Sequence, residues 1–183
     1  MMKFTKLKIP DLVVCVPKIL LDDRGYFMES FRHDELEKFL GYSVSFCQEN
    51  ETSSSYGVIR GLHFQQAPHG QAKLVRVTKG KVLDVVVDIR KNSKTFGEYI
   101  SIELSAENKK QLFIPVGFAH GFIVLSDVAV LNYKVDNYYN YDSERGIAFN
   151  DRFLDIDWKL SDDKIVLSNK DKNQPLFKDS EYF

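Results

Sequence analysis

The most constraining feature of the chain is a succession of short runs rich in β-branched and aromatic residues, each bounded by turn-forming residues. The longest stretch, Leu74–Ile89, is mostly valine and leucine and is interrupted by Thr78-Lys-Gly80. Such residues suit a pleated, half-buried surface, and several short strands at regular spacing are typical of sandwiches and barrels. The 14 Phe and 9 Tyr residues strengthen the preference. The sequence therefore predicts an all-β fold.

The predicted strands are Leu12–Leu21, Gly25–Phe31, Lys73–Val77, Lys81–Arg90, Ile100–Leu104, Leu112–Ile114, Gly121–Leu125 and Val128–Val135. We interpret Thr78-Lys-Gly80 as a short hairpin turn, with Gly80 where a positive φ is needed. One helix is predicted at His33–Leu40, because its apolar residues share a face and Gly41 supplies a stop. One helical turn is predicted near Ser161–Lys164. A jelly roll is the simplest β-sandwich or barrel for this pattern.

Length and charge limit the classes of protein that remain. With 183 residues and a formal net charge of −1, the chain is long enough for one domain and has no electrostatic reason to bind nucleic acid or an anionic membrane. No apolar run approaches the roughly 18 residues that cross a bilayer, and the first residues lack the apolar region of a signal peptide. Cys15 and Cys47 lie in apolar stretches and are predicted to be buried, reduced thiols. We therefore expect a cytoplasmic protein.

One short segment carries the groups that point to chemistry. The sequence Arg60-Gly-Leu-His-Phe-Gln-Gln-Ala-Pro68, followed by Lys73, brings a guanidinium, an imidazole and an amine into one neighbourhood. An imidazole that takes a proton, beside an ammonium that stabilises negative charge, is typical of proton abstraction next to a carbonyl. The apolar strands that follow would hold these groups still.

Two segments resemble the signature of the cupin jelly roll, with an alteration. They are Gly57-x5-His63-x-Gln65 and Pro115-x-Gly117-x2-His120. Metal-binding cupins carry His-x-His and a downstream glutamate in the first segment, whereas here Gln65 replaces the second histidine and Lys73 stands where the glutamate is expected. A protonated lysine cannot ligate a cation and repels it. We therefore expect no metal, and a proton-transfer site in the same place.

The altered pattern resembles the dTDP-4-dehydrorhamnose 3,5-epimerase family, the RmlC-like cupins, nearly from end to end. The matching segments are Asp23-Arg-Gly-Tyr-Phe-Met-Glu29, Gln48-Glu-Asn50, Arg60-Gly-Leu-His-Phe-Gln65, Lys73-Leu-Val-Arg-Val77, Asp84-Val-Val-Val-Asp88, Phe113-Ile-Pro-Val-Gly-Phe-Ala-His-Gly121, Tyr133-Lys134, Tyr138-Tyr139, Glu144-Arg-Gly146, Asp157-Trp158 and Leu167-Ser-Asn-Lys-Asp171. The resemblance implies one cupin domain over residues 1–183. Its jelly-roll core would span about residues 45–150, with the N-terminal strands and the C-terminal segment packed on it.

The same resemblance implies a reaction without a cofactor. Its substrate would be a nucleotide-linked 4-keto-6-deoxyhexose, dTDP-4-dehydro-6-deoxy-D-glucose, inverted at C3 and C5 to dTDP-4-dehydro-L-rhamnose. The C4 ketone acidifies the hydrogens on both neighbouring carbons, so that removing one gives an enolate and returning a proton from the opposite face inverts the centre. The family also implies a homodimer, in which Leu12–Leu21 would add a strand to the neighbour's sheet. Gln48 or Arg24 would then serve the partner's site.

The resemblance assigns four catalytic residues. His63 would be the base, and Asp171 the carboxylate that orients its imidazole. Tyr133 would be the acid on the opposite face of the sugar, and Lys73 would stabilise the enolate oxygen. The pairing of His63 with Asp171 and the opposite placement of Tyr133 come from the family alone.

The resemblance also assigns residues that bind substrate. Arg24, Arg60 and Lys170 would hold the diphosphate, because their side chains are cationic donors. Tyr139 corresponds to the ring that stacks on thymine. The remaining positions, which would contact the sugar, the base or both, are Phe27, Glu29, Gln48, Asn50, Lys73, His120 and Glu144.

Strand periodicity adds an expectation that is independent of the family. If Lys73 faces inward, Val75 and Val77 share its face while Leu74 and Arg76 take the other. On the next strand, Asp84 lies on a face with valines and needs a partner if it is buried. We predict that this partner is His120.

Other functions stay open from the residues. One alternative is a relative that inverts only C3 or only C5, or that uses another nucleotide. A second is a metal-dependent cupin, against which Gln65 and Lys73 argue. A third is a non-catalytic protein that binds a sugar nucleotide, because a fold alone does not give a function.

Overall fold

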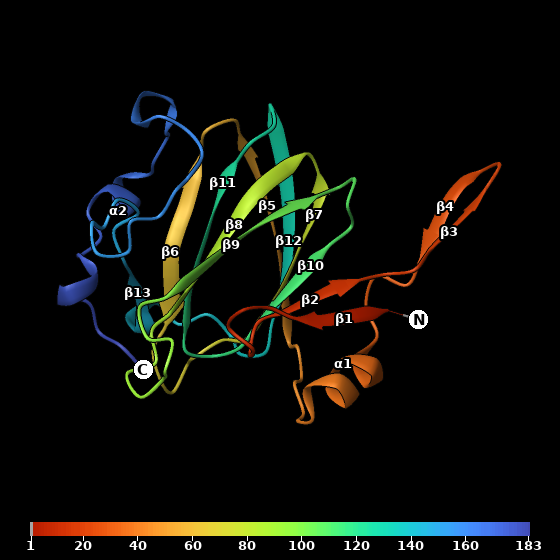
Figure 1. The fold of residues 1–183 in the computed structure, drawn as a ribbon, viewed down its shortest axis with the longest axis horizontal. Helices are drawn as coiled ribbons and strands as arrows, with labels where there is room; N and C mark the ends of the chain where they lie inside the picture. The colour runs from red at the N-terminus through yellow and green to blue at the C-terminus, as the bar shows by residue number, and fades with distance from the viewer. Residues whose placement is uncertain (1) are drawn as a thin grey trace.

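The computed structural model describes residues 2–183, which form a β-sandwich with a projecting arm (Figure 1). Its strands are β1 (Lys3–Lys6), β2 (Val13–Val16), β3 (Ile19–Asp22), β4 (Gly25–Met28), β5 (Gln48–Ser55), β6 (Ile59–Gln65), β7 (Lys73–Lys79), β8 (Lys81–Asp88), β9 (Tyr99–Ser105), β10 (Gln111–Ile114), β11 (Phe118–Val124), β12 (Val128–Val135) and β13 (Glu144–Gly146). The helices are α1 (His33–Leu40) and α2 (Asn169–Lys172), and the 3-10 turns are η1 (Tyr141–Ser143), η2 (Asp162–Lys164) and η3 (Phe177–Asp179).

Two antiparallel sheets face each other, which confirms the predicted all-β, jelly-roll class. One sheet has the order β1-β2-β10-β7-β12-β5, and the other has the order β13-β6-β11-β8-β9. Neighbours in these sheets are often distant in the sequence: β7, for example, pairs with β10 and β12. The sandwich therefore brings chemistry-bearing residues from separate segments to one interior.

The predicted hairpin at Thr78-Lys-Gly80 is wrong. Strand β7 belongs to the six-stranded sheet and β8 to the five-stranded sheet, so the turn carries the chain from one layer to the other. Gly80 does have a positive φ of 71°, and a Cβ there would meet the carbonyl oxygen of Val128 at 2.1 Å. A turn with a glycine suits a reversal within one sheet as well as a passage between two sheets. Strand β8 is buried on both faces, so its side chains show no alternation that would indicate its sheet. Local pattern alone could not tell which strand β7 pairs with.

The interior between the sheets follows the predicted phase of the strands. Val75 and Val77 of β7 and Val82 and Val86 of β8 belong to one buried apolar cluster. Leu74 belongs to a separate cluster on the outer face of the six-stranded sheet. Since side chains alternate along a strand, Lys73 shares the face of Val75 and points toward the interior.

Helix α1 packs against the outer face of the six-stranded sheet. It has the predicted bounds and ends at Gly41, which adopts a left-handed conformation with φ 80°. Its buried residue Leu36 packs in a cluster with Leu74 and Phe113. The apolar stripe and the glycine stop are sufficient to explain both the helix and its end.

The C-terminal segment covers the outer face of the five-stranded sheet (Figure 1). Trp158 and Phe177 are buried against Val85 and Val87 of β8. Between Trp158 and Phe177 the chain returns to β6 through an isolated parallel bridge between Val58 and Val166. This return places helix α2 beside β6.

Two features of the N-terminal region differ from the compact core. The hairpin β3–β4 projects from the sandwich as an arm (Figure 1), and within it Leu21 is 81% and Phe27 65% exposed. Both cysteines are free as predicted, but the prediction of burial is wrong for Cys47. Cys47 lies just before edge strand β5, where an apolar neighbourhood in sequence is not enclosed in space.

Within residues 2–183, no helix is long and apolar enough to cross a membrane.

Candidate active site

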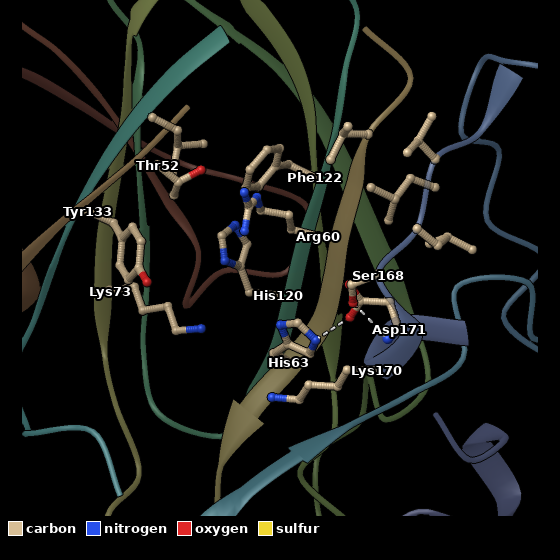
Figure 2. A pocket seen from close by; sticks show the side chains of 15 residues that line it. Thr52, Arg60, His63, Lys73, His120, Phe122, Tyr133, Ser168, Lys170 and Asp171 are labelled. Atoms are coloured by element: carbon tan, nitrogen blue, oxygen red, sulfur yellow. Dashed lines mark hydrogen bonds and ion pairs between the residues drawn. The ribbon is translucent and has the colours of Figure 1, made fainter. Parts of the chain in front are cut away.

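A cavity of about 550 Å³ lies inside the sandwich and receives side chains from both sheets and from the C-terminal segment. Its polar lining includes many of the residues singled out from the sequence (Figure 2): Arg60, His63, Lys73, His120, Tyr133, Lys170 and Asp171. Lys73 and Tyr133 lie on one side of the view, His63 and Asp171 on the other, and His120 with Arg60 between them. The cavity thus has acid–base groups on facing walls.

His63 and Asp171 form a hydrogen-bonded pair, as the family resemblance implied. His63 Nε2 lies 2.6 Å from Asp171 Oδ1, although the two residues are 108 positions apart. The Asp171 side chain is buried, which raises its pKa, but hydrogen bonds from His63 and Ser168 outweigh burial and hold the pKa below its usual value. An ionised carboxylate accepts, so Nε2 carries the proton and the other ring nitrogen, Nδ1, is free to accept one.

Lys73 and Tyr133 occupy neighbouring strands of the opposite sheet. Tyr133 of β12 lies directly across from Val75 of β7, two positions after Lys73. Burial lowers the pKa of Lys73 to about 8, against the opposing charges of Asp84 and Glu144. Burial also raises the pKa of Tyr133. At neutral pH the cavity therefore holds an ammonium group and a protonated phenol on the wall opposite the imidazole.

His120 and Asp84 form a second buried pair, which confirms the predicted partnership. His120 Nε2 lies 3.0 and 2.9 Å from the two carboxylate oxygens of Asp84, which is fully buried. In the ladder between β11 and β6, His120 stands opposite His63. A Cβ at Gly61 would meet the Cα of Gly121 at 2.4 Å, so only glycine permits β6 to come this close to β11 beside the histidines.

A third polar group adjoins the cavity. The Tyr139 hydroxyl donates to Glu144 Oε2 at 2.7 Å, and the Lys170 ammonium contacts the same carboxylate oxygen. Burial of Glu144 is outweighed by these two partners, which lower its pKa, and Glu144 in turn raises the pKa of Tyr139 to about 12. The Tyr139 ring remains 51% exposed. An accessible ring thus lies next to a cation that lines the cavity.

Several residues expected to bind substrate lie away from the cavity of their own chain. Arg24 and Phe27 are on the β3–β4 arm, where Arg24 is paired with Asp22. Glu29 follows the arm and lies 3.6 Å from Arg32. None of the three lines the cavity.

Gln48 and Asn50 occupy an intermediate place. They belong to edge strand β5, and Gln48 Nε2 donates to Asn50 Oδ1 at 2.8 Å. Asn50 stands opposite Tyr133 in the ladder, although neither amide lines the cavity. Both residues therefore lie on the strand next to Tyr133 but outside the lining of the cavity.

Comparison with known proteins identifies the family of the chain. The model of the dTDP-4-dehydrorhamnose 3,5-epimerase family matches residues 6–179. The dTDP-4-dehydrorhamnose 3,5-epimerase of Shigella flexneri is 49% identical over 182 residues, which cover 100% of this chain and 99% of that protein. This chain belongs to the dTDP-4-dehydrorhamnose 3,5-epimerase family.

Solved structures agree with the assignment to this epimerase family. The dTDP-4-dehydrorhamnose 3,5-epimerase of Elizabethkingia anophelis matches with a TM-score of 0.95 and 50% identity, covering 99% of each chain. The dTDP-6-deoxy-D-glucose-3,5-epimerase RmlC of Legionella pneumophila, solved in complex with dTDP-4-keto-L-rhamnose, matches with a TM-score of 0.93 and 45% identity. That match covers 97% of this chain and 94% of the other. The sandwich described above is thus the fold of the epimerase family.

Part of the cavity wall consists of residues that were not predicted from the sequence. The additional lining residues are Thr52, Val58, Ile59, Phe122, Leu131, Val166, Leu167 and Ser168. Thr52 shares the strand face of Gln48 and Asn50 by simple alternation, so period two would have found it. Ser168 precedes Asp171 by three residues, which is the spacing of a helix N-cap. The apolar residues carry no signal that separates a cavity wall from an ordinary core.

Proposed function

We propose that this chain is a cofactor-independent 3,5-epimerase that converts dTDP-4-dehydro-6-deoxy-D-glucose into dTDP-4-dehydro-L-rhamnose. The observation that carries the proposal is the His63–Asp171 pair, which faces Lys73 and Tyr133 across one cavity in a member of this epimerase family. The Legionella pneumophila relative bound to dTDP-4-keto-L-rhamnose supports the same sugar class.

The first half of each inversion is removal of a proton. His63 Nδ1 takes the proton from the carbon next to the C4 ketone, and the electrons of the broken C–H bond move into a C–C double bond and onto the ketone oxygen. Asp171 stabilises the imidazolium that results, since it already accepts from Nε2. Lys73 donates to the enolate oxygen, an interaction whose loss typically raises a barrier by about 3–4 kcal/mol.

The second half is return of a proton from the other face. Tyr133 lies on the wall opposite His63 (Figure 2), and burial favours its protonated form. Its hydroxyl proton forms the new C–H bond as the enolate electrons return to carbon. The phenolate then takes a proton from solvent, and His63 releases its proton to solvent, so the enzyme is ready for the other carbon.

The remaining polar groups suit the nucleotide. Arg60 and Lys170 line the cavity and offer cationic donors to a diphosphate. Tyr139 presents an accessible ring for the base, beside Glu144 and Lys170. His120, braced by Asp84, lines the cavity between Lys73 and His63 and would contact the sugar (Figure 2). Gln48 and Asn50 extend this set along β5.

We also propose a homodimer, in which the β3–β4 arm packs on a second copy of the chain. The exposed fractions of Leu20, Leu21 and Phe27 are 51%, 81% and 65%, and burying them would be favourable. The arm also carries Arg24 away from the cavity of its own chain. An exchange of arms would bring Arg24, Phe27 and Glu29 toward the partner's cavity, where the family resemblance needs them.

The double substitution Leu20→Glu with Leu21→Glu is expected to convert the dimer into a monomer, because it places two carboxylates in an apolar contact. Light scattering after size exclusion measures the mass directly. The control variant Asn92→Glu adds a carboxylate to an exposed loop outside the arm and should remain a dimer. A wild-type protein that is monomeric and fully active at micromolar concentration would overturn the homodimer.

The rival functions receive less support. A metal-dependent cupin needs a ligand set, and within residues 2–183 no three His, Cys, Asp or Glu side chains gather as one. A protein that only binds a sugar nucleotide has no need of a base, whereas Asp171 holds His63 with one ring nitrogen able to accept a proton.

We propose the cytoplasm as the place of action, since the free thiols of Cys15 and Cys47 suit a reducing compartment.

The experiment that tests the function is turnover of dTDP-4-dehydro-6-deoxy-D-glucose followed by NMR. The expected product has inverted configuration at both C3 and C5. Parallel incubations with other nucleotide-linked 4-keto sugars test the choice of nucleotide. Absence of turnover on all of them, with tight binding retained, would favour a non-catalytic binding protein.

A further inference from the structure

The carboxylate of Asp171 is held at both oxygens by different partners. His63 Nε2 lies 2.6 Å from Oδ1, and the Ser168 hydroxyl donates to Oδ2 at 2.7 Å (Figure 2). Asp171 is 5% exposed, so water has little access to either oxygen. With a donor at each end, the plane of the carboxylate is fixed, and Oδ1 points at the imidazole.

Ser168 is itself tied to the strand that carries His63. Two residues earlier, the backbone of Val166 accepts from Ile59 N at 3.0 Å and donates to Gly57 O at 2.9 Å. Ile59 is the first residue of β6, on which His63 lies. Ser168 also accepts from Asp171 N at 3.1 Å as the N-cap of α2. The serine, the carboxylate and the imidazole therefore share one rigid frame.

We propose that Ser168 is a positioning residue for the epimerase reaction, which aligns Asp171 so that His63 presents its free nitrogen to the substrate. The inference rests on the proposed function of His63 as the base. In this arrangement Ser168, Asp171 and His63 form a chain of hydrogen bonds, and the hydroxyl group of the serine is committed to Asp171.

The capping role of Ser168 does not account for the contact by itself. A cap needs only the hydroxyl oxygen, which accepts from Asp171 N. The hydroxyl proton is a separate donor, and it goes to Asp171 Oδ2 rather than to solvent. Without that donor, Oδ2 would be buried and unpaired, and rotation of the carboxylate would weaken its bond to Nε2. The imidazole would then lose the partner that fixes its tautomer.

The variant Ser168→Ala is expected to lower kcat about 10-fold, the order expected for one lost hydrogen bond to a charged group, while KM changes less than about 2-fold. Ser168→Thr keeps the hydroxyl and should restore most of kcat. Ser168→Gly lacks the hydroxyl but is tolerated at an N-cap, so it should lose kcat as alanine does even if alanine weakens the helix. A kcat within 2-fold of wild type for both Ala and Gly would overturn the proposal.

A double-mutant cycle tests whether Ser168 acts through Asp171. In an Asp171→Ala background, Ser168→Ala should change kcat by less than about 2-fold, because the group it positions is gone. A further 10-fold loss in that background would mean a general structural role and would contradict the proposal. Wild-type turnover in the same assay separates the proposed function from the proposed role of Ser168. If the wild-type protein shows no turnover, the proposed function is wrong. If the wild-type protein turns over and Ser168→Ala is equally active, only the role of Ser168 is wrong.

Discussion

Replacing His63 with asparagine is expected to lower kcat/KM by a factor of about 10²–10⁴, the usual contribution of a positioned general base. The amide can still donate to Asp171, so the cavity should keep its shape, but it cannot take a proton from carbon at neutral pH. Steady-state turnover of the 4-keto sugar nucleotide measures the loss.

The matched control is His33→Asn, which makes the same change at an exposed position on α1. This variant should retain wild-type activity. A His63→Asn protein that is folded and keeps more than about a tenth of wild-type kcat/KM would contradict the role of His63 as base.

Replacing Lys73 with methionine is expected to lower kcat by about 10²–10³-fold, because the enolate loses its cationic donor. The same ammonium group should limit the activity of the wild-type enzyme at alkaline pH. Burial lowers the pKa of Lys73 to about 8, so the donor loses its charge as pH rises through that value. Wild-type kcat should therefore fall above about pH 8.

The Lys73→Met variant should also be more stable than wild type, by about 1–3 kcal/mol at pH 7, because the fold no longer buries a charge. The sign follows from linkage: a lysine whose pKa falls from 10.5 to about 8 on folding destabilises the fold fully below pH 8. That penalty disappears between pH 8 and 10.5, so the advantage of the variant should shrink over the same range.

Urea unfolding at pH 7 and pH 10 measures this difference. Lys79→Met, at the exposed end of the same strand, is the matched control and should show neither effect. An inactive Lys73→Met protein that is less stable than wild type would contradict the account of a buried, functional charge.

Local pattern was sufficient for most of the elements. Alternation predicted the faces of β7 and β8, and the glycine stop predicted the end of α1 at Gly41. Pairing between strands depends on the whole sandwich, and for this reason the hairpin at Thr78-Lys-Gly80 was predicted wrongly. The glycine in the turn indicates a positive φ, but it does not indicate which strands lie beside β7 and β8 in the sheets.

The site divides in the same way. His63 and Lys73 were recognisable because they stand together with Arg60 before an apolar strand and match the altered cupin pattern. Asp171 sits in a run that reads as a solvated charged surface, and only the return of the chain along Val58 and Val166 brings it to His63. The spacing of Ser168 and Asp171 indicates a helix N-cap. The second contact of the serine hydroxyl, to the side chain of Asp171, could not be predicted, because it depends on the burial of that carboxylate in the fold.

The measurement that tests the central claim most directly is proton exchange during turnover in heavy water. If His63 removes protons from the carbons on both sides of the C4 ketone, and Tyr133 returns solvent-derived ones, NMR of the product will find deuterium at both C3 and C5. Wild-type product that carries deuterium at only one of these carbons would contradict the double inversion. Product without deuterium at either carbon would contradict proton transfer as the chemistry of this cavity.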